Sequence, residues 1–193
     1  MSPLQRNSLL VVLLALLSYP LQAGALDAQG WFEKGNELSD EGRFQEAAEA
    51  YQKSIGQNPE SPVGHYNLGI AYKNLKKYEQ AVLSFKKTLE LEPEYLDARL
   101  SLGNVYNLQE RWEDAIGELN IVIHRRQGDA EAHGNLGWAY FNYQGTPSFK
   151  QLVIVNLKKA VELFAEQDLP EAAEATQKVL DEAMIRYGYG QSE

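Results

Sequence analysis

The 193-residue sequence contains no cysteine. Disulfide bonds and an anchor attached to a lipidated cysteine are therefore excluded. Basic residues are also scarce, since 18 lysines and arginines stand against 27 acidic residues, giving a net charge of −9. Binding to nucleic acid depends on a basic surface. The charge balance therefore predicts no nucleic acid partner.

The sequence also lacks the short motifs of common enzymes. It has no H-E-x-x-H, G-x-S-x-G, P-loop or C-x-x-C segment. Of its three histidines, His65 and His133 are far apart in the chain, and His124 stands in a His-Arg-Arg run. We interpret the first two as packed or half-exposed side chains, and the run as a basic helix end whose cations complement the helix dipole. The sequence therefore predicts no catalytic residue, no metal ligand and no cofactor.

A period of 34 residues runs through the chain instead. Glycine recurs at this spacing. Residues at fixed distances after the glycine recur with it: a tyrosine three residues later, an alanine twelve later and a proline twenty-four later. A fixed period of this length predicts stacked supersecondary units rather than one central core. The residues that mark it are Gly35, Gly69, Gly103, Gly137, Tyr72, Tyr106, Tyr140, Ala47, Ala81, Ala115, Pro59 and Pro93.

Each period is interpreted as two antiparallel helices. In its first half, apolar residues and glycine are spaced by three and four, as at Leu68, Gly69 and Tyr72, so they lie on one stripe of a helix. Glycine within a helix costs about 1 kcal/mol relative to alanine. We therefore expect glycine where a bulky residue of the facing helix needs room, and Tyr51 and Phe85 are suitable partners. The proline near the end of the period stops the second helix.

These columns resemble the tetratricopeptide repeat family, whose pattern is W-x2-L-G-x2-Y, then A-x3-F, then P. Trp31, Gly35, Ala47, Tyr51 and Pro59 match the pattern in the first unit. The resemblance implies an all-α, right-handed α-solenoid of about four helix-turn-helix units, which a C-terminal capping helix closes. The expected segments are repeats at 28–61, 62–95, 96–129 and 130–167, a capping helix at 170–187 and a loose tail at 188–193.

The fourth unit loses register after Tyr140. Its second helix matches the earlier ones if Leu157 corresponds to Phe85, and this requires an insertion of about four residues near 143–147. The sequence leaves the exact register of this helix open.

The resemblance also implies a binding surface. In this family the first helix of each repeat lines the concave wall of the superhelix, through its second, fifth, ninth, twelfth and thirteenth positions. Large apolar side chains and asparagines occupy many of these positions, which is typical of a wall that binds an extended peptide. The predicted groove residues are Phe32, Asn36, Tyr66, Ile70, Lys73, Asn74, Leu100, Asn104, Asn107, Leu108, Trp138, Phe141 and Asn142.

One family subtype is not expected. Members that clamp the C-terminal carboxylate of a partner use lysine or arginine at inner positions of the first and third repeats. Here those positions hold Phe32, Asn36, Leu100 and Asn104. The resemblance therefore implies no carboxylate clamp.

The first 25 residues stand outside the repeats. Arg6 precedes an apolar run at Leu9–Leu17, Pro20 interrupts the run, and Ala23-Gly24-Ala25 forms an A-x-A cleavage site, as in a secretory signal peptide. We expect cleavage and a periplasmic location. The uncharged stretch 7–26 has 20 residues, close to the ~20 that a membrane-spanning helix needs. An uncleaved membrane anchor is therefore the alternative.

Two functions fit these observations. The first is a non-enzymatic adaptor whose groove binds a peptide or an extended segment of an envelope protein and aids the assembly of a complex. The second is a structural scaffold in which copies of the chain self-associate through convex or end surfaces.

Overall fold

The computed structural model describes residues 26–143 and 149–189. The predicted signal peptide, most of the predicted insertion and the last four residues of the predicted tail lie outside these ranges. Within them, the regular elements are α-helices and there is no β-strand. The helices are α2 (Ala28–Asp40), α3 (Phe44–Gln57), α4 (Pro62–Asn74), α5 (Tyr78–Leu91), α6 (Leu96–Leu108), α7 (Trp112–Arg125), α8 (Ala130–Asn142), α9 (Lys150–Glu166) and α10 (Pro170–Tyr187).

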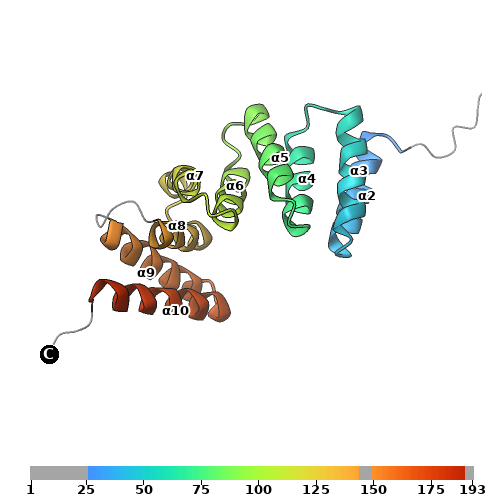
Figure 1. Cartoon of the computed structure of the whole chain (residues 1–193). Helices are drawn as coiled ribbons and strands as arrows, with labels where there is room; N and C mark the ends of the chain where they lie inside the picture. Colours follow the sequence, from blue (N-terminus) through green and yellow to red (C-terminus); the bar gives the residue numbers. More distant parts are fainter. Residues whose placement is uncertain (1–25, 144–148, 190–193) are drawn as a thin grey trace, which may run out of the picture.

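The helices form a curved array in which each one packs on the next along the chain (Figure 1). The pairs α2/α3, α4/α5, α6/α7 and α8/α9 are the four repeats, and α10 packs on α9 at the C-terminal end. The first helices of the last three repeats also touch, since α4 contacts α6 and α6 contacts α8, and the capping helix α10 contacts α8. They therefore line the inner side of the curve. The predicted all-α solenoid with a capping helix is confirmed.

The periodic glycines lie where the two helices of a repeat approach each other. A Cβ atom added to Gly69 would lie 2.5 Å from the ring of Phe85, and one added to Gly103 would lie 2.7 Å from Cγ of Leu119. Real Cβ atoms do not approach so closely. Gly35 faces Tyr51 in the same way. The predicted pairing of glycine with a bulky residue is therefore confirmed.

The fourth repeat keeps this contact across a longer connection. A Cβ atom at Gly137 would lie 2.7 Å from Cγ of Leu157, so Leu157 takes the place that Phe85 has in the second repeat. Helices α3, α5 and α7 begin nine residues after the glycine of their repeat, whereas α9 begins thirteen residues after Gly137. The four additional residues precede α9.

Two histidines connect one repeat to the next. His65 Nε2 lies 2.9 Å from the carbonyl oxygen of Pro59, and His133 Nε2 lies 3.0 Å from that of Gln127. In the third repeat, Arg99 donates to the carbonyl oxygen of Pro93 over 3.0 Å. All three bonds join equivalent positions, so the two histidines have structural roles.

The turn between the two helices of a repeat carries backbone strain that can be tested. The residue two positions before the start of the second helix is in the left-handed region in the first three repeats, with φ of 75° at Gly42 and 58° at both Lys76 and Glu110. This region costs a residue other than glycine about 1–2 kcal/mol, and the greater freedom of glycine in the unfolded chain offsets about 0.4–1 kcal/mol of that cost. Lys76→Gly and Glu110→Gly should therefore each raise the free energy of unfolding by up to about 1 kcal/mol in urea denaturation.

Gly42→Lys, the reverse change, is the control and should lower the free energy of unfolding. Equal stability of all three variants and the parent chain would contradict this account of the turn.

Candidate peptide-binding groove

The inner wall presents several of the predicted apolar residues to solvent. Trp138 on α8 is 39% exposed and Leu108 at the end of α6 is also exposed, while Ile70 and Leu100 are half-buried. A wall that keeps large apolar side chains in contact with water is typical of a protein interaction surface.

The aromatic residues at the fifth position of the first two repeats pack against the core and also line the wall. The ring of Phe32 lies 5.9 Å from that of Tyr51, and the ring of Tyr66 lies 5.8 Å from that of Phe85. Tyr66 also stacks on Tyr95, with 5.1 Å between the ring centroids. Burial raises the pKa of the Tyr66 hydroxyl. Replacing these rings would therefore disturb folding as well as binding.

Tyr95 stands where the other repeats have a helix cap. Asp27, Ser61 and Asp129 occupy the equivalent position in repeats one, two and four, and each accepts a backbone N–H from the first turn of its helix. Such a cap contributes about 1 kcal/mol. The third repeat has no side-chain cap and instead adds a second aromatic ring beside Tyr66.

The predicted asparagines are hydrogen-bonded within the wall. Asn36 Oδ1 accepts from the Tyr51 hydroxyl and from Asn67 Nδ2, over 2.8 and 3.0 Å. Asn74 and Asn142 each use Nδ2 to bond the carbonyl oxygen four residues earlier in their helix. Their side-chain oxygens remain able to accept from the backbone N–H groups of an extended peptide.

Two of the predicted groove residues are buried, and this corrects the sequence-based list. Phe141 is only 5% exposed because α10 covers it, with the Arg186 guanidinium 3.8 Å from its ring centroid. Asn107 is 8% exposed because it packs against the next repeat, where its Nδ2 donates to the carbonyl oxygen of Asn135 over 2.9 Å. Neither residue can contact a ligand without a local rearrangement.

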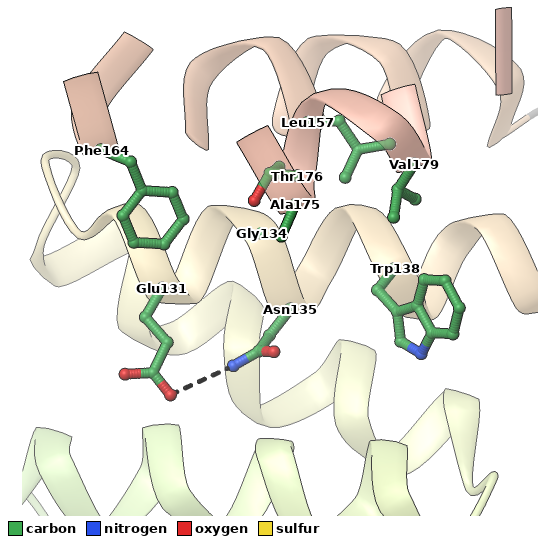
Figure 2. A pocket seen from close by; sticks show the side chains of 9 residues that line it. All are labelled: Glu131, Gly134, Asn135, Trp138, Leu157, Phe164, Ala175, Thr176 and Val179. Atoms are coloured by element: carbon green, nitrogen blue, oxygen red, sulfur yellow. Dashed lines mark hydrogen bonds between the residues drawn. The ribbon is translucent and has the colours of Figure 1, made fainter. Parts of the chain in front are cut away.

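The hollow next to the capping helix was not predicted. Helices α8, α9 and α10 border an open space of 230 Å³, which Figure 2 shows from close by. Trp138 stands at one end of it and Phe164 at the other, and Val179 of α10 closes one side. Phe164 and Val179 lie outside the first helices of the four repeats, so the family positions could not identify them.

A second hollow adjoins the first along the inner wall. Glu131 and Phe164 line both of them, and the second extends to Asp97 and Leu100 on α6. The wall here is therefore apolar and acidic.

Arg126 is the one cation among the residues that line the second hollow. Its guanidinium lies 2.5 Å from the carboxylate of Asp97 and 4.0 Å from that of Asp129. Glu131 receives only amide donors, from Asn104 over 3.3 Å and from Asn135 over 3.5 Å. Glu131 is thus the carboxylate of this surface with no cation partner in the described part of the chain.

The described residues contain no group of three or more histidine, aspartate or glutamate side chains that could hold a metal ion. The inner wall offers a ligand aromatic and aliphatic side chains, amides and carboxylates. These groups can bind a ligand noncovalently through apolar contact, hydrogen bonds and charge.

Known protein structures resemble this one over most of its length. MamA from Desulfovibrio magneticus RS-1, from residue 41 to its end, is 24% identical, with 86% of this chain and 97% of that chain covered and a TM-score of 0.67. The first tetratricopeptide domain of Spaghetti (RPAP3), bound to the HSP90 peptide SRMEEVD, is 27% identical over 58% of this chain and 89% of that chain, with a TM-score of 0.57. The second such domain of human RPAP3, in complex with the HSP70 peptide SGPTIEEVD, is 22% identical over 58% and 93%, with a TM-score of 0.56.

Comparison with family models agrees with the fold. The tetratricopeptide repeat model matches residues 62–95, and a second model of the same repeat matches residues 35–76. No curated protein matches the sequence. From the repeat models, the paired helices and the glycine contacts between them, we conclude that this chain contains tetratricopeptide repeats.

Proposed function

We propose that this chain is a non-enzymatic adaptor, which binds a peptide or an extended segment of an envelope protein in its concave groove and so aids the assembly of a complex. The observation that carries the proposal is the open apolar hollow beside Trp138 on the inner wall. Two structures of the same fold, those of the RPAP3 domains, hold peptides.

The groove offers a peptide both apolar contact area and hydrogen-bond acceptors. Exposed aromatic and aliphatic side chains provide the contact area that dominates binding energy at interfaces. The asparagines of the wall provide acceptors for the backbone of an extended chain. Because the helices are packed before the partner arrives, little conformational entropy is lost on the adaptor's side.

Trp138 should be a major contact of the partner. Truncating a central tryptophan of an interface typically costs 2 kcal/mol or more, which is about 30-fold in affinity. Trp138→Ala should therefore weaken binding by about that factor in calorimetry, once a partner has been captured from an envelope fraction. Asn104→Ala should weaken it less. Circular dichroism of both variants should stay helical.

Lys87→Ala on α5 is the control, since Lys87 lies outside the hollows of the inner wall and pairs with Glu90. Loss of binding in this variant with normal binding in Trp138→Ala would place the partner on the convex face and contradict the groove.

Export to the periplasm is part of the proposal. It is supported by the charge, apolar run and A-x-A site of residues 1–25, which lie outside the described residues. None of the helices in the described ranges is both long and apolar enough to cross a membrane. N-terminal sequencing of the mature protein should begin at Leu26. Retention of residues 1–25 with membrane attachment through a carbonate wash would instead support the anchor.

Self-association is the second candidate function. Leu83 on α5 and Val155 on α9 occupy equivalent positions of their repeats and are 68% and 61% exposed. Apolar side chains repeated along the outer helices favour contacts between copies. Light scattering that gives the mass of a single chain at micromolar concentration would exclude this candidate.

A further inference from the structure

The hollow between α8, α9 and α10 exists because one side chain is missing. The fifth position of the repeat holds Phe32, Tyr66 and Leu100 in the first three repeats but Gly134 in the fourth. The rings of Phe32 and Tyr66 pack onto the second helix of their own repeat. At Gly134 no side chain fills this place, and Gly134 lines the hollow instead (Figure 2).

Gly134 is not required by packing, unlike the periodic glycines. A Cβ atom added to it would lie 3.7 Å from Cβ of Ala160 and 3.8 Å from the ring of Phe164, which are ordinary van der Waals distances. Glycine in a helix interior costs about 1 kcal/mol relative to alanine. The fourth repeat therefore has an unfavourable residue without a backbone or packing reason, and its effect is to keep the hollow open.

The size of the hollow favours a single side chain as occupant. Its 230 Å³ suits one large side chain, and the adjoining hollow of 520 Å³ leaves room along the wall for the rest of an extended chain. Its walls are mostly apolar, with Leu157, Phe164 and Val179 facing the space. One bulky apolar side chain of a peptide fits these properties.

The charges around the hollow favour a cation next to that side chain. Glu131 lines both adjoining hollows and lacks a cation partner in the described ranges, while Arg126 is already neutralised by Asp97. Burial is the main cause of the raised pKa of Tyr66; Asp97 and Glu131 raise it further, whereas a hydrogen bond with Ser101 and the charge of Arg126 lower it.

We infer that the hollow opened by Gly134 receives a large apolar side chain of an extended peptide, and that a lysine or arginine beside it in the peptide pairs with Glu131. This inference rests on the proposed function and specifies the chemistry of its ligand. The peptides named with the two RPAP3 domains, SRMEEVD and SGPTIEEVD, end in acidic residues. The ligand of this groove carries the opposite charge.

The test begins with a random dodecapeptide phage library selected on the chain without its first 25 residues, 26–193. The selected peptides should be enriched in lysine or arginine next to leucine, phenylalanine, tryptophan or methionine, and depleted in aspartate and glutamate. The acidic peptide SGPTIEEVD, which contains no lysine or arginine, serves as the negative probe and should not compete with them in fluorescence anisotropy.

Gly134→Leu tests the hollow itself. The leucine side chain occupies the space that the peptide needs, so the affinity for a selected peptide should fall at least tenfold, while the melting temperature stays the same or rises because leucine is the better helix former. Gly117→Leu on α7 is the matched control, since a Cβ atom there would meet nothing within 4 Å. It should leave the affinity unchanged.

Glu131→Gln tests the charge through a double-mutant cycle. This variant should weaken binding of the selected peptide about two- to fivefold, the size expected of an exposed ion pair. It should not affect an analogue whose basic residue is replaced by norleucine. Glu49→Gln, which removes an exposed charge from α3 outside both hollows, should have no effect on either peptide.

The outcomes separate the inference from the proposed function. Selected peptides that lose affinity in Trp138→Ala but show no basic preference and no coupling to Glu131 would overturn the inference and leave the adaptor function standing. Peptides that bind Gly134→Leu with undiminished affinity would also overturn it. A selection that yields no binder, or only binders that Trp138→Ala and Gly134→Leu do not affect, would count against both.

Discussion

Gly103→Leu should lower the free energy of unfolding by about 2–3 kcal/mol, because overpacking a tight helix contact costs about this much. Leucine at this position would force apart α6 and α7, since even a Cβ atom would lie 2.7 Å from Leu119. For a chain of this length each kcal/mol shifts the melting temperature by about 2–4 °C. Differential scanning calorimetry should therefore show a melting temperature lower by about 4–12 °C.

Gly117→Leu is the matched control for this variant. Gly117 lies in α7, next to the same helix contact in sequence, but a Cβ atom there would meet nothing within 4 Å. Leucine is favoured over glycine in a helix by a few tenths to about 1 kcal/mol, so the control should be as stable as the parent chain or more so. Equal melting temperatures of Gly103→Leu and Gly117→Leu would show that Gly103 does not limit the packing of α6 on α7.

Deleting residues 170–193 should unfold the C-terminal end of the array. Without α10, the apolar side chains that it covers on α8 and α9, Phe141 among them, become exposed to water. In a repeat array each unit is stabilised mainly by its immediate neighbours. Hydrogen exchange should therefore show lost protection in α8 and α9 and retained protection in α2–α5, together with a broader thermal transition.

Leu180→Ala distinguishes lost packing from other effects of the truncation. Leu180 is buried between α10 and the rest of the array, and such a truncation in a core costs about 2–5 kcal/mol. The variant should weaken protection in α9 and α10 first. A truncated chain that stays soluble and protects α8 and α9 as the parent does would refute the capping role of α10.

The repeating elements of this protein are determined by its sequence alone. The 34-residue spacing of Gly35, Gly69, Gly103 and Gly137 predicts the helix pairs, and the structure places a bulky residue against each of these glycines. Even the displaced contact of Leu157 could be recognised from the pattern. This succeeds because the contacts within a repeat join residues at fixed short separations, so that each repeat independently shows the same pattern.

At the C-terminal end of the groove, tertiary structure determines which side chains are exposed. The family positions select Phe141 and Asn107, yet α10 covers the first and the next repeat covers the second. The same positions include Gly134, whose missing side chain opens a hollow only because Phe164 and Val179 border it from α9 and α10. Burial at these places depends on which helix packs against the repeat from outside, and the pattern within a repeat carries no information about that neighbour.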